Sequence, residues 1–118
     1  MNEQELKART KQFGLRVIKL VNALPNKPAA WTLGNQLLRA GTSVGANYRA
    51  ACRGRSLAEF VSKLGNVEEE ADESMFWMEL IVESGLMPGN MVKPLLKEAD
   101  ELTAIMSASR KSAKGHRS

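Results

Sequence analysis

Apolar side chains recur every three or four positions along most of the chain, which is the spacing of amphipathic helices. In the first segment the recurring positions are Leu6, Thr10, Phe13, Val17, Leu20, Val21 and Leu24. This pattern predicts a helix over about residues 3–24. Pro25 and Pro28 end it, because the residue before a proline is driven out of the helical conformation.

The next segment keeps the helical period but consists largely of small residues and arginines. Its apolar side carries Leu33, Leu37, Ala40, Val44, Tyr48 and Ala51, and the opposite side carries Asn35, Arg39, Thr42, Ala46, Arg49 and Arg53. A second helix is therefore expected from about Ala29 to the residues before Gly54. A narrow row of Gly34, Gly41, Gly45 and Cys52 runs beside the apolar side. Glycine in a helix costs about 1 kcal/mol relative to alanine, so this row predicts the close approach of another backbone.

A third helix is expected between Ser56 and Gly85. Ser56 is a typical N-cap, and Glu59 follows at the spacing of a capping box. The apolar stripe comprises Leu57, Phe60, Leu64, Val67, Ala71, Met75, Met78 and Val82. Phe76 and Trp77 lie off this stripe, so we expect the fourth helix or another subunit to cover them.

The last periodic segment, from Val92 to Met106, predicts a fourth helix over about residues 90–110. We therefore expect one domain over residues 1–111 and a basic, disordered tail over residues 112–118. Four amphipathic helices with short connections predict an all-α fold, an antiparallel up-and-down four-helix bundle.

Charge is distributed unevenly along the chain, although the net value is only +4. Residues 1–55 contain ten Lys and Arg against two acids, whereas residues 56–106 contain three against eleven. This asymmetry suits either nucleic-acid binding or the pairing of basic and acidic helices within and between subunits. Without a long apolar run or a secretion leader, we expect a cytoplasmic protein that does not enter a membrane.

Three stretches carry a family resemblance: Leu33–Tyr48, Arg55–Phe60 and Lys63–Ser74. They resemble the bacterial four helix bundle protein family, which includes proteins encoded in intervening sequences of 23S ribosomal RNA genes. The family's fold is shared by the accessory protein of diversity-generating retroelements. The resemblance implies a homo-oligomer, namely a pentamer, and for the retroelement protein it implies nucleic-acid binding and partnership with a reverse transcriptase. Many members have a Glu-Gly pair where this chain has Ala50 and Ala51.

Five cations are the candidates for binding RNA or DNA: Arg39, Arg49, Arg53, Arg55 and Lys63. Arginine can hold phosphates through charge-assisted hydrogen bonds. The alternative is that these residues pair with the acidic run Glu68–Glu73 of the adjacent helix or of a neighbouring subunit. No aromatic residue interleaves with the arginines on this face, so any nucleic acid should be bound by its backbone, with little sequence preference.

The remaining candidates indicate packing rather than chemistry. A di-iron bundle needs two Glu-x-x-His motifs, but the only histidine is His116, so we expect no metal, no cofactor and no catalytic residue. Cys52 is the only cysteine, and we expect it to pack in the glycine row. Packing or oligomer contacts are expected at Gly41, Gly45, Asn47, Phe76 and Trp77. The predicted function is non-enzymatic nucleic-acid binding or support of a nucleic-acid enzyme, and the alternative is a protein-protein scaffold.

Overall fold

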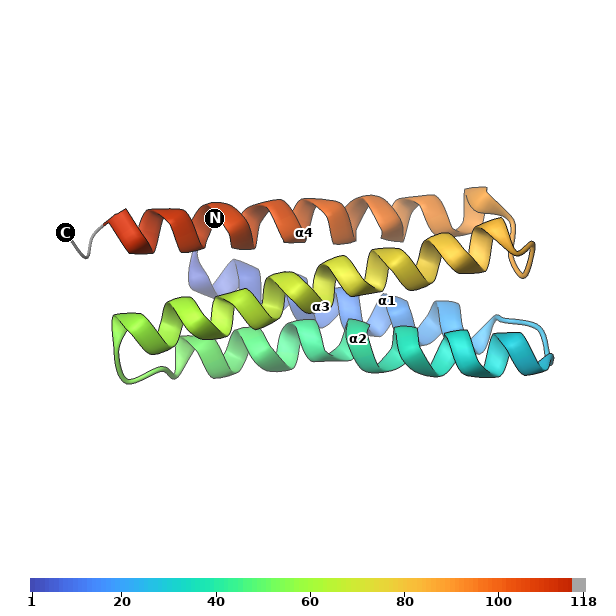
Figure 1. Ribbon diagram of the computed structural model, residues 1–118, viewed down its shortest axis with the longest axis horizontal. Coiled ribbons are helices and arrows are strands. Elements are labelled where there is room, and N and C mark those ends of the chain that lie inside the picture. Colours follow the sequence, from blue (N-terminus) through green and yellow to red (C-terminus); the bar gives the residue numbers. More distant parts are fainter. Residues whose placement is uncertain (116–118) are drawn as a thin grey trace.

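Residues 1–115 are described by the computed structural model, and they form four α-helices joined by short loops (Figure 1). The helices are α1 (Glu3–Asn22), α2 (Pro28–Cys52), α3 (Leu57–Glu83) and α4 (Gly89–Gly115). No strand occurs within these residues. The all-α class and the four predicted helices are confirmed, and the limits of the first three agree with the prediction to within two residues.

Each helix runs back alongside the one before it, giving an elongated bundle of 50 × 20 × 19 Å (Figure 1). Contacts are extensive between α1 and α2, α2 and α3, and α3 and α4, but sparse between α1 and α4. The start of α1, the α2–α3 loop and the end of α4 lie at the same end of the bundle (Figure 1). Basic residues near the end of α2 therefore share this end with the first turns of α1.

Local signals set where the helices begin and end. The Asn2 side chain accepts a hydrogen bond from the Glu5 backbone N–H at 2.8 Å, and Ser56 accepts one from the Glu59 backbone N–H at 3.1 Å. Pro28 occupies the first position of α2, where its missing N–H costs nothing. Gly85 has φ of 79° just after α3, the left-handed conformation that ends helices. Ser56 and Gly85 thus act as the sequence predicts.

The core is formed by one face of each helix. Its largest fully buried side chains are Phe13, Val17, Leu37, Val44, Leu64, Val67, Met78, Ile81, Val92, Leu102 and Met106. The predicted stripe on α3 is only partly right, because Leu57 is exposed at the end of the bundle, and Met75 and Val82 are half-buried. Ser74 and Ile81 are buried instead, because the buried positions keep a seven-residue repeat (Leu64, Ala71, Met78 and Val67, Ser74, Ile81), whereas the predicted stripe departs from that repeat at Met75 and Val82.

Glycine allows α1 and α2 to pack unusually closely. A Cβ atom at Gly41 would lie 2.6 Å from a side-chain carbon of Val17, and one at Gly45 would lie 3.2 Å from the backbone oxygen of Thr10. Gly14 of α1 faces Gly41 in return, since a Cβ there would lie 3.8 Å from the Gly41 backbone oxygen. The backbone that approaches the glycine row is therefore that of α1, in the same chain.

The fourth helix is longer than predicted and contradicts the disordered tail over residues 112–115. It continues to Gly115, beyond the expected end of the domain at residue 111. Ala113 is buried seven residues after the buried Met106, so the apolar side of α4 extends by two more turns. Arg110 also anchors this end by donating to Glu68 of α3 at 2.7 Å. Residues 116–118 of the predicted tail lie outside the described residues.

Candidate nucleic-acid interface

The five candidate cations fall into two groups in the structure. Arg39 and Lys63 have acidic partners within the chain. The other three are exposed and make no ion pair with any of residues 1–115; we call them the arginine cluster, comprising Arg49, Arg53 and Arg55. The structure thus supports the ion-pairing interpretation for Arg39 and Lys63, and it leaves the charge of the arginine cluster available.

Arg39 is held against α3 by two carboxylates. One guanidinium nitrogen donates to Glu70 at 3.3 Å, and another donates to Glu73. The Trp77 indole N–H also donates to the Glu73 carboxylate, at 3.1 Å. This network ties α2 to α3 midway along the bundle, so it reduces the charge that Arg39 can offer to an external ligand.

Burial changes the titration of one member of this network. Partial desolvation raises the pKa of the Glu70 carboxyl above its ordinary value, and the charge of Arg39 opposes that rise. The Glu70 side chain is only 20% exposed, whereas that of Arg39 is 49% exposed. The ion pair therefore sits at the edge of the helix interface, with its acidic half the more enclosed.

Lys63 makes a weaker contact. Its ammonium lies 3.9 Å from the carboxylate of Glu59, one turn earlier on α3. Pairs of this kind on a helix surface contribute little to stability and break easily in water. Lys63 is therefore partly screened by its neighbour but is not enclosed.

The arginine cluster occupies the end of α2 and the loop that follows. Arg49 and Arg53 continue the exposed stripe that Arg39 begins, with Arg49 in the last turn and Arg53 at the C-cap. Cations here also interact favourably with the negative end of the helix dipole. That stabilising role requires no external ligand, and it leaves the guanidinium donors open to solvent.

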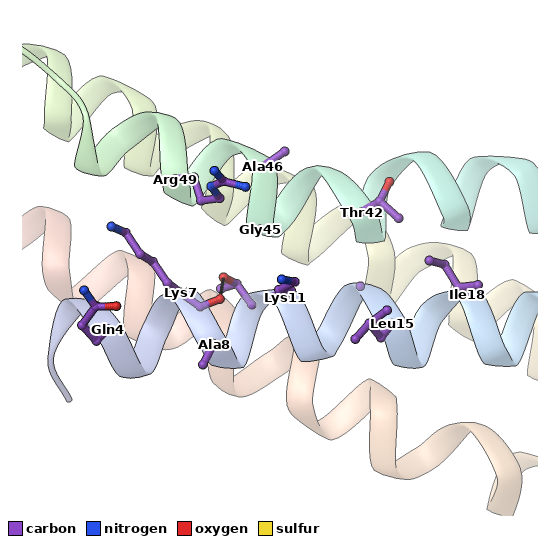
Figure 2. Close-up of a pocket in the computed structure, with 12 residues that line it drawn as sticks. Gln4, Lys7, Ala8, Lys11, Leu15, Ile18, Thr42, Gly45, Ala46 and Arg49 are labelled. Atoms are coloured by element: carbon purple, nitrogen blue, oxygen red, sulfur yellow. Dashed lines mark hydrogen bonds between the residues drawn. The ribbon is translucent and has the colours of Figure 1, made fainter.

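An open hollow beside the cluster runs between α1 and α2, and we call it the α1–α2 groove (Figure 2). Its volume is about 680 Å³. It is lined by Gln4, Lys7, Ala8, Thr10, Lys11, Gly14, Leu15, Ile18, Thr42, Gly45, Ala46 and Arg49. None of these residues is acidic, and three of them are cationic. The groove exists because the glycines bring the two helix backbones together and leave no side chains to fill the space above them.

Sequence analysis missed the contribution of α1 to this surface. Lys7 pairs with Glu3 at 3.2 Å, whereas Lys11 makes no ion pair within residues 1–115. Leu15 and Ile18 are exposed although both are large and apolar. The available signal was that these two residues lie outside the apolar stripe predicted for the first helix.

The predicted packing residues occupy different environments. Gly41 and Gly45 lie against α1, as described above. Trp77 is half-buried beside Glu73, and Phe76 is half-exposed, with its ring edge-on to Trp77 at 5.1 Å between centroids. Asn47 is half-buried and makes no side-chain hydrogen bond within residues 1–115. Within residues 1–115, Phe76 is therefore only partly covered.

The structure offers little for catalysis in the part that it describes. Burial raises the pKa of the half-buried Cys52 thiol, which disfavours the reactive thiolate. Residues 1–115 contain no cluster of three His, Cys, Asp or Glu side chains placed to hold a metal ion. Over the same residues, none of the helices combines the length and apolarity needed to span a bilayer.

Comparisons with known proteins place the chain in a family. A family model described as 23S rRNA-intervening sequence protein matches residues 2–108. A similar solved structure is a protein of unknown function from the S23 ribosomal protein family of Bacteroides thetaiotaomicron, with a TM-score of 0.87 and 28% sequence identity over 94% of this chain and 99% of that chain. No curated protein matches the sequence. Because the family model covers nearly all of the bundle, this chain belongs to the 23S rRNA-intervening sequence protein family.

Proposed function

We propose that this protein binds nucleic acid through the phosphate backbone, using the arginine cluster of Arg49, Arg53 and Arg55. The observation that carries the proposal is that these three side chains are exposed and unpaired within residues 1–115, whereas Arg39 on the same helix is engaged by carboxylates. Exposed guanidinium groups bind phosphate oxygens with two parallel hydrogen bonds. The activity is non-enzymatic and cytoplasmic.

Binding should be insensitive to sequence. The arginine cluster contains no aromatic side chain, and Tyr48, which precedes Arg49, is buried. Stacking on bases therefore has no platform among these residues, and phosphate contacts carry no sequence information. A cluster of three arginines predicts moderate affinity that falls as salt rises.

The family resemblance suggests a wider context for this activity. A pentamer would display several arginine clusters on one particle, and their combined binding would exceed that of one chain. Partnership with a reverse transcriptase, as implied for the retroelement accessory protein, would use the same surface. The competing function is a protein-protein scaffold without nucleic acid, and the exposed Phe76 on an acidic helix favours it.

The test compares two double charge reversals with the same change in net charge. Arg53→Glu with Arg55→Glu alters the arginine cluster outside the α1–α2 groove, and Lys93→Glu with Lys97→Glu alters exposed positions on α4. Fluorescence anisotropy with labelled single-stranded RNA, single-stranded DNA and duplex DNA measures affinity. We expect the first variant to bind at least ten times more weakly and the second to bind nearly as well as the natural protein.

Two results would refute this proposal. If the natural protein fails to bind any of the three probes at low salt, the scaffold function stands instead. If both double variants lose affinity equally, binding reflects net charge and not the arginine cluster. Circular dichroism on each variant ensures that a loss of binding is not a loss of fold.

A further inference from the structure

A second hollow between α1 and α2 lies at the far end of the bundle from the arginine cluster. It has a volume of about 410 Å³, and we call it the Trp31 hollow. It is lined by Val21, Leu24, Pro25, Asn26, Ala30, Trp31, Gly34 and Asn35. The α1–α2 loop forms this end of the bundle, and the α2–α3 loop with the arginine cluster forms the other (Figure 1). The hollow therefore has no part in phosphate binding by the arginine cluster itself.

Trp31 gives this hollow a large aromatic surface. Its side chain is 56% exposed. The indole N–H donates to the side-chain oxygen of Asn26 at 2.8 Å, which holds the ring in one orientation. Tryptophan combines a wide apolar ring with a single polar N–H, and here the N–H is already satisfied. The exposed part of the ring is therefore a rigid, flat apolar platform.

Trp31 lies on the same side of α2 as the arginine cluster. It precedes Arg49 by 18 positions, which is five turns of a helix with 3.6 residues per turn, so the two side chains leave α2 in the same direction. They are separated by about 27 Å along the helix, from the rise of 1.5 Å per residue. A stacked strand of about eight nucleotides, at 3.4 Å each, covers that distance.

α1 and α2 present no negative charge along this path. Residues 6–55 contain neither Asp nor Glu. None of the residues that line the Trp31 hollow is charged, and Lys27 beside it is exposed and makes no ion pair within residues 1–115. The two α3 carboxylates that approach the middle of α2 are engaged by Arg39. The surroundings of the hollow therefore favour a ligand with negative charge.

We propose that the Trp31 hollow binds a base of a single-stranded nucleic acid whose phosphates contact the arginine cluster. The base stacks on the Trp31 indole. The exposed Asn35 side chain, which makes no hydrogen bond within residues 1–115, contacts the edge of the base. An asparagine amide carries both donors and an acceptor, as base edges require.

This inference rests on the proposed nucleic-acid binding and specifies its ligand. The bases of a duplex are stacked on one another, whereas those of a single strand can turn outward onto an aromatic side chain. Stacking tolerates every base, because each has a flat aromatic face. A single strand should therefore bind more tightly than a duplex, still with little sequence preference.

A proline-rich peptide is the main competing ligand for an exposed tryptophan. Such peptides dock in grooves lined by aromatic side chains. The one donor that Trp31 could offer to a peptide carbonyl is engaged by Asn26. Stacking of a base uses the face of the ring and leaves that hydrogen bond intact. The basic surroundings also attract phosphates and give a neutral peptide no advantage, so the base is the better fit.

The experiment compares three labelled probes by fluorescence anisotropy. They are a single strand of about 15 deoxyadenosines, the same strand with abasic sites in place of its bases, and the duplex of the first strand with its complement; each is longer than the path from Trp31 to Arg49. Trp31→Ala removes the platform and, because the side chain is exposed, leaves the core intact. Met91→Ala is the matched control, since Met91 is also 56% exposed but lies on α4.

We expect Trp31→Ala to bind the single strand at least about fivefold more weakly, as the loss of one stacked base would. Its affinity for the abasic strand and for the duplex should stay within about twofold of the natural value, because those probes offer no base to stack. Trp31→Phe should recover part of the loss, since it keeps an aromatic face. Met91→Ala should bind all three probes as the natural protein does.

Tryptophan fluorescence reports contact with the base directly. The chain has two tryptophans, so in a Trp77→Phe background the emission comes from Trp31. The single strand should quench this emission, and the abasic strand should not. Quenching by a polyproline peptide but not by the single strand would assign the hollow to a proline-rich partner and overturn the inference.

Failure of this inference can be told from failure of the proposed function. If Trp31→Ala binds the single strand as tightly as the natural protein, whereas Arg53→Glu with Arg55→Glu binds it more weakly, the inference is wrong and the arginine cluster keeps its role. An equal loss of affinity for all three probes in Trp31→Ala also contradicts stacking. If the natural protein binds none of the probes, both proposals are wrong.

Discussion

Arg39 and Arg53 lie on the same exposed stripe of α2, yet their surroundings differ. Near the middle of the bundle, α3 presents Glu70 and Glu73 to Arg39, and the three side chains form one network. At the end of α2, Arg53 and its neighbours Arg49 and Arg55 meet no carboxylate in residues 1–115. The residue type is the same in both regions, so the facing helix decides which arginines hold the bundle together and which remain available.

This difference shows how one helix can serve both packing and binding. The α3 acids concentrate between Glu68 and Glu73, opposite the middle of α2 and the end of α4. Beyond that region α3 carries Lys63 and Glu59, which pair with each other. The end of the bundle that carries the arginine cluster therefore stays basic, because the α3 acids that could neutralise it lie farther along the helix.

The largest expected difference between the two regions is the loss of stability caused by Arg39→Glu. This change removes two attractive contacts and adds a third carboxylate beside Glu70 and Glu73. We expect the free energy of unfolding to fall by about 1 to 2 kcal/mol, because exposed pairs are worth up to about 1 kcal/mol and their reversal is repulsive. Urea denaturation measures it. Arg53→Glu is the control and should change stability by less than half as much; equal losses would remove the distinction between the regions.

The next effect is on affinity, from Arg49→Ala. Loss of one phosphate contact should weaken binding of duplex DNA by about threefold to tenfold and reduce the slope of log affinity against log salt by about 1. Fluorescence anisotropy at several salt concentrations gives both values. Arg39→Ala should leave the slope unchanged. A larger change from Arg39→Ala than from Arg49→Ala would mean that the paired arginine is the one that binds.

A smaller effect, a gain in nucleic-acid affinity, is expected when Arg39 loses its carboxylate partners. Replacing Glu70 and Glu73 together by Gln removes its partners and two negative charges near the stripe. The freed guanidinium should then raise nucleic-acid affinity by about twofold to threefold, as one further phosphate contact would. The same anisotropy assay applies, with Glu79→Gln and Glu83→Gln as the charge-matched control. An equal gain in the control would show that net charge alone is responsible.

The smallest effect is a pH dependence at Glu70. Burial raises its pKa in the folded state, so the folded protein holds this proton more tightly than the unfolded chain does. The contribution of Glu70 to the free energy of unfolding therefore falls as pH rises from below the unfolded pKa to above the folded one. Glu70→Gln should match the natural protein in acid and gain relative stability toward neutral pH. Denaturation curves at both ends of this range decide the sign, and a relative loss toward neutral pH would contradict it.

Much of the fold follows from local patterns. The spacing of apolar residues predicts the four helices, and the exposed stripe of α2 from Asn35 to Arg53 is exposed as predicted. Ser56 and Gly85 mark helix ends through their own backbone chemistry. The end of α4 was missed because small and basic residues there are compatible with both helix and disorder. Its helical state depends on Ala113 packing and on Arg110 reaching Glu68.

The surface sites were less predictable, because they depend on which side chains face each other across helices. Sequence alone placed Arg39 and Arg53 in one group, and only the register of α3 against α2 separates them. The groove also needed the approach of α1, which brings Lys11, Leu15 and Ile18 beside Arg49. Glycine at 41 and 45 indicated a close neighbour but did not identify which helix it was.

The most direct test of the central claim is the salt dependence of duplex DNA binding by the natural protein and by Arg53→Glu with Arg55→Glu. Three phosphate contacts per chain predict a slope of log affinity against log salt of about −2.7, from about −0.9 per phosphate. The account predicts a slope near this value for one chain of the natural protein and a slope nearer to zero for the double variant. A natural slope near zero, or the same slope for both proteins, would contradict it.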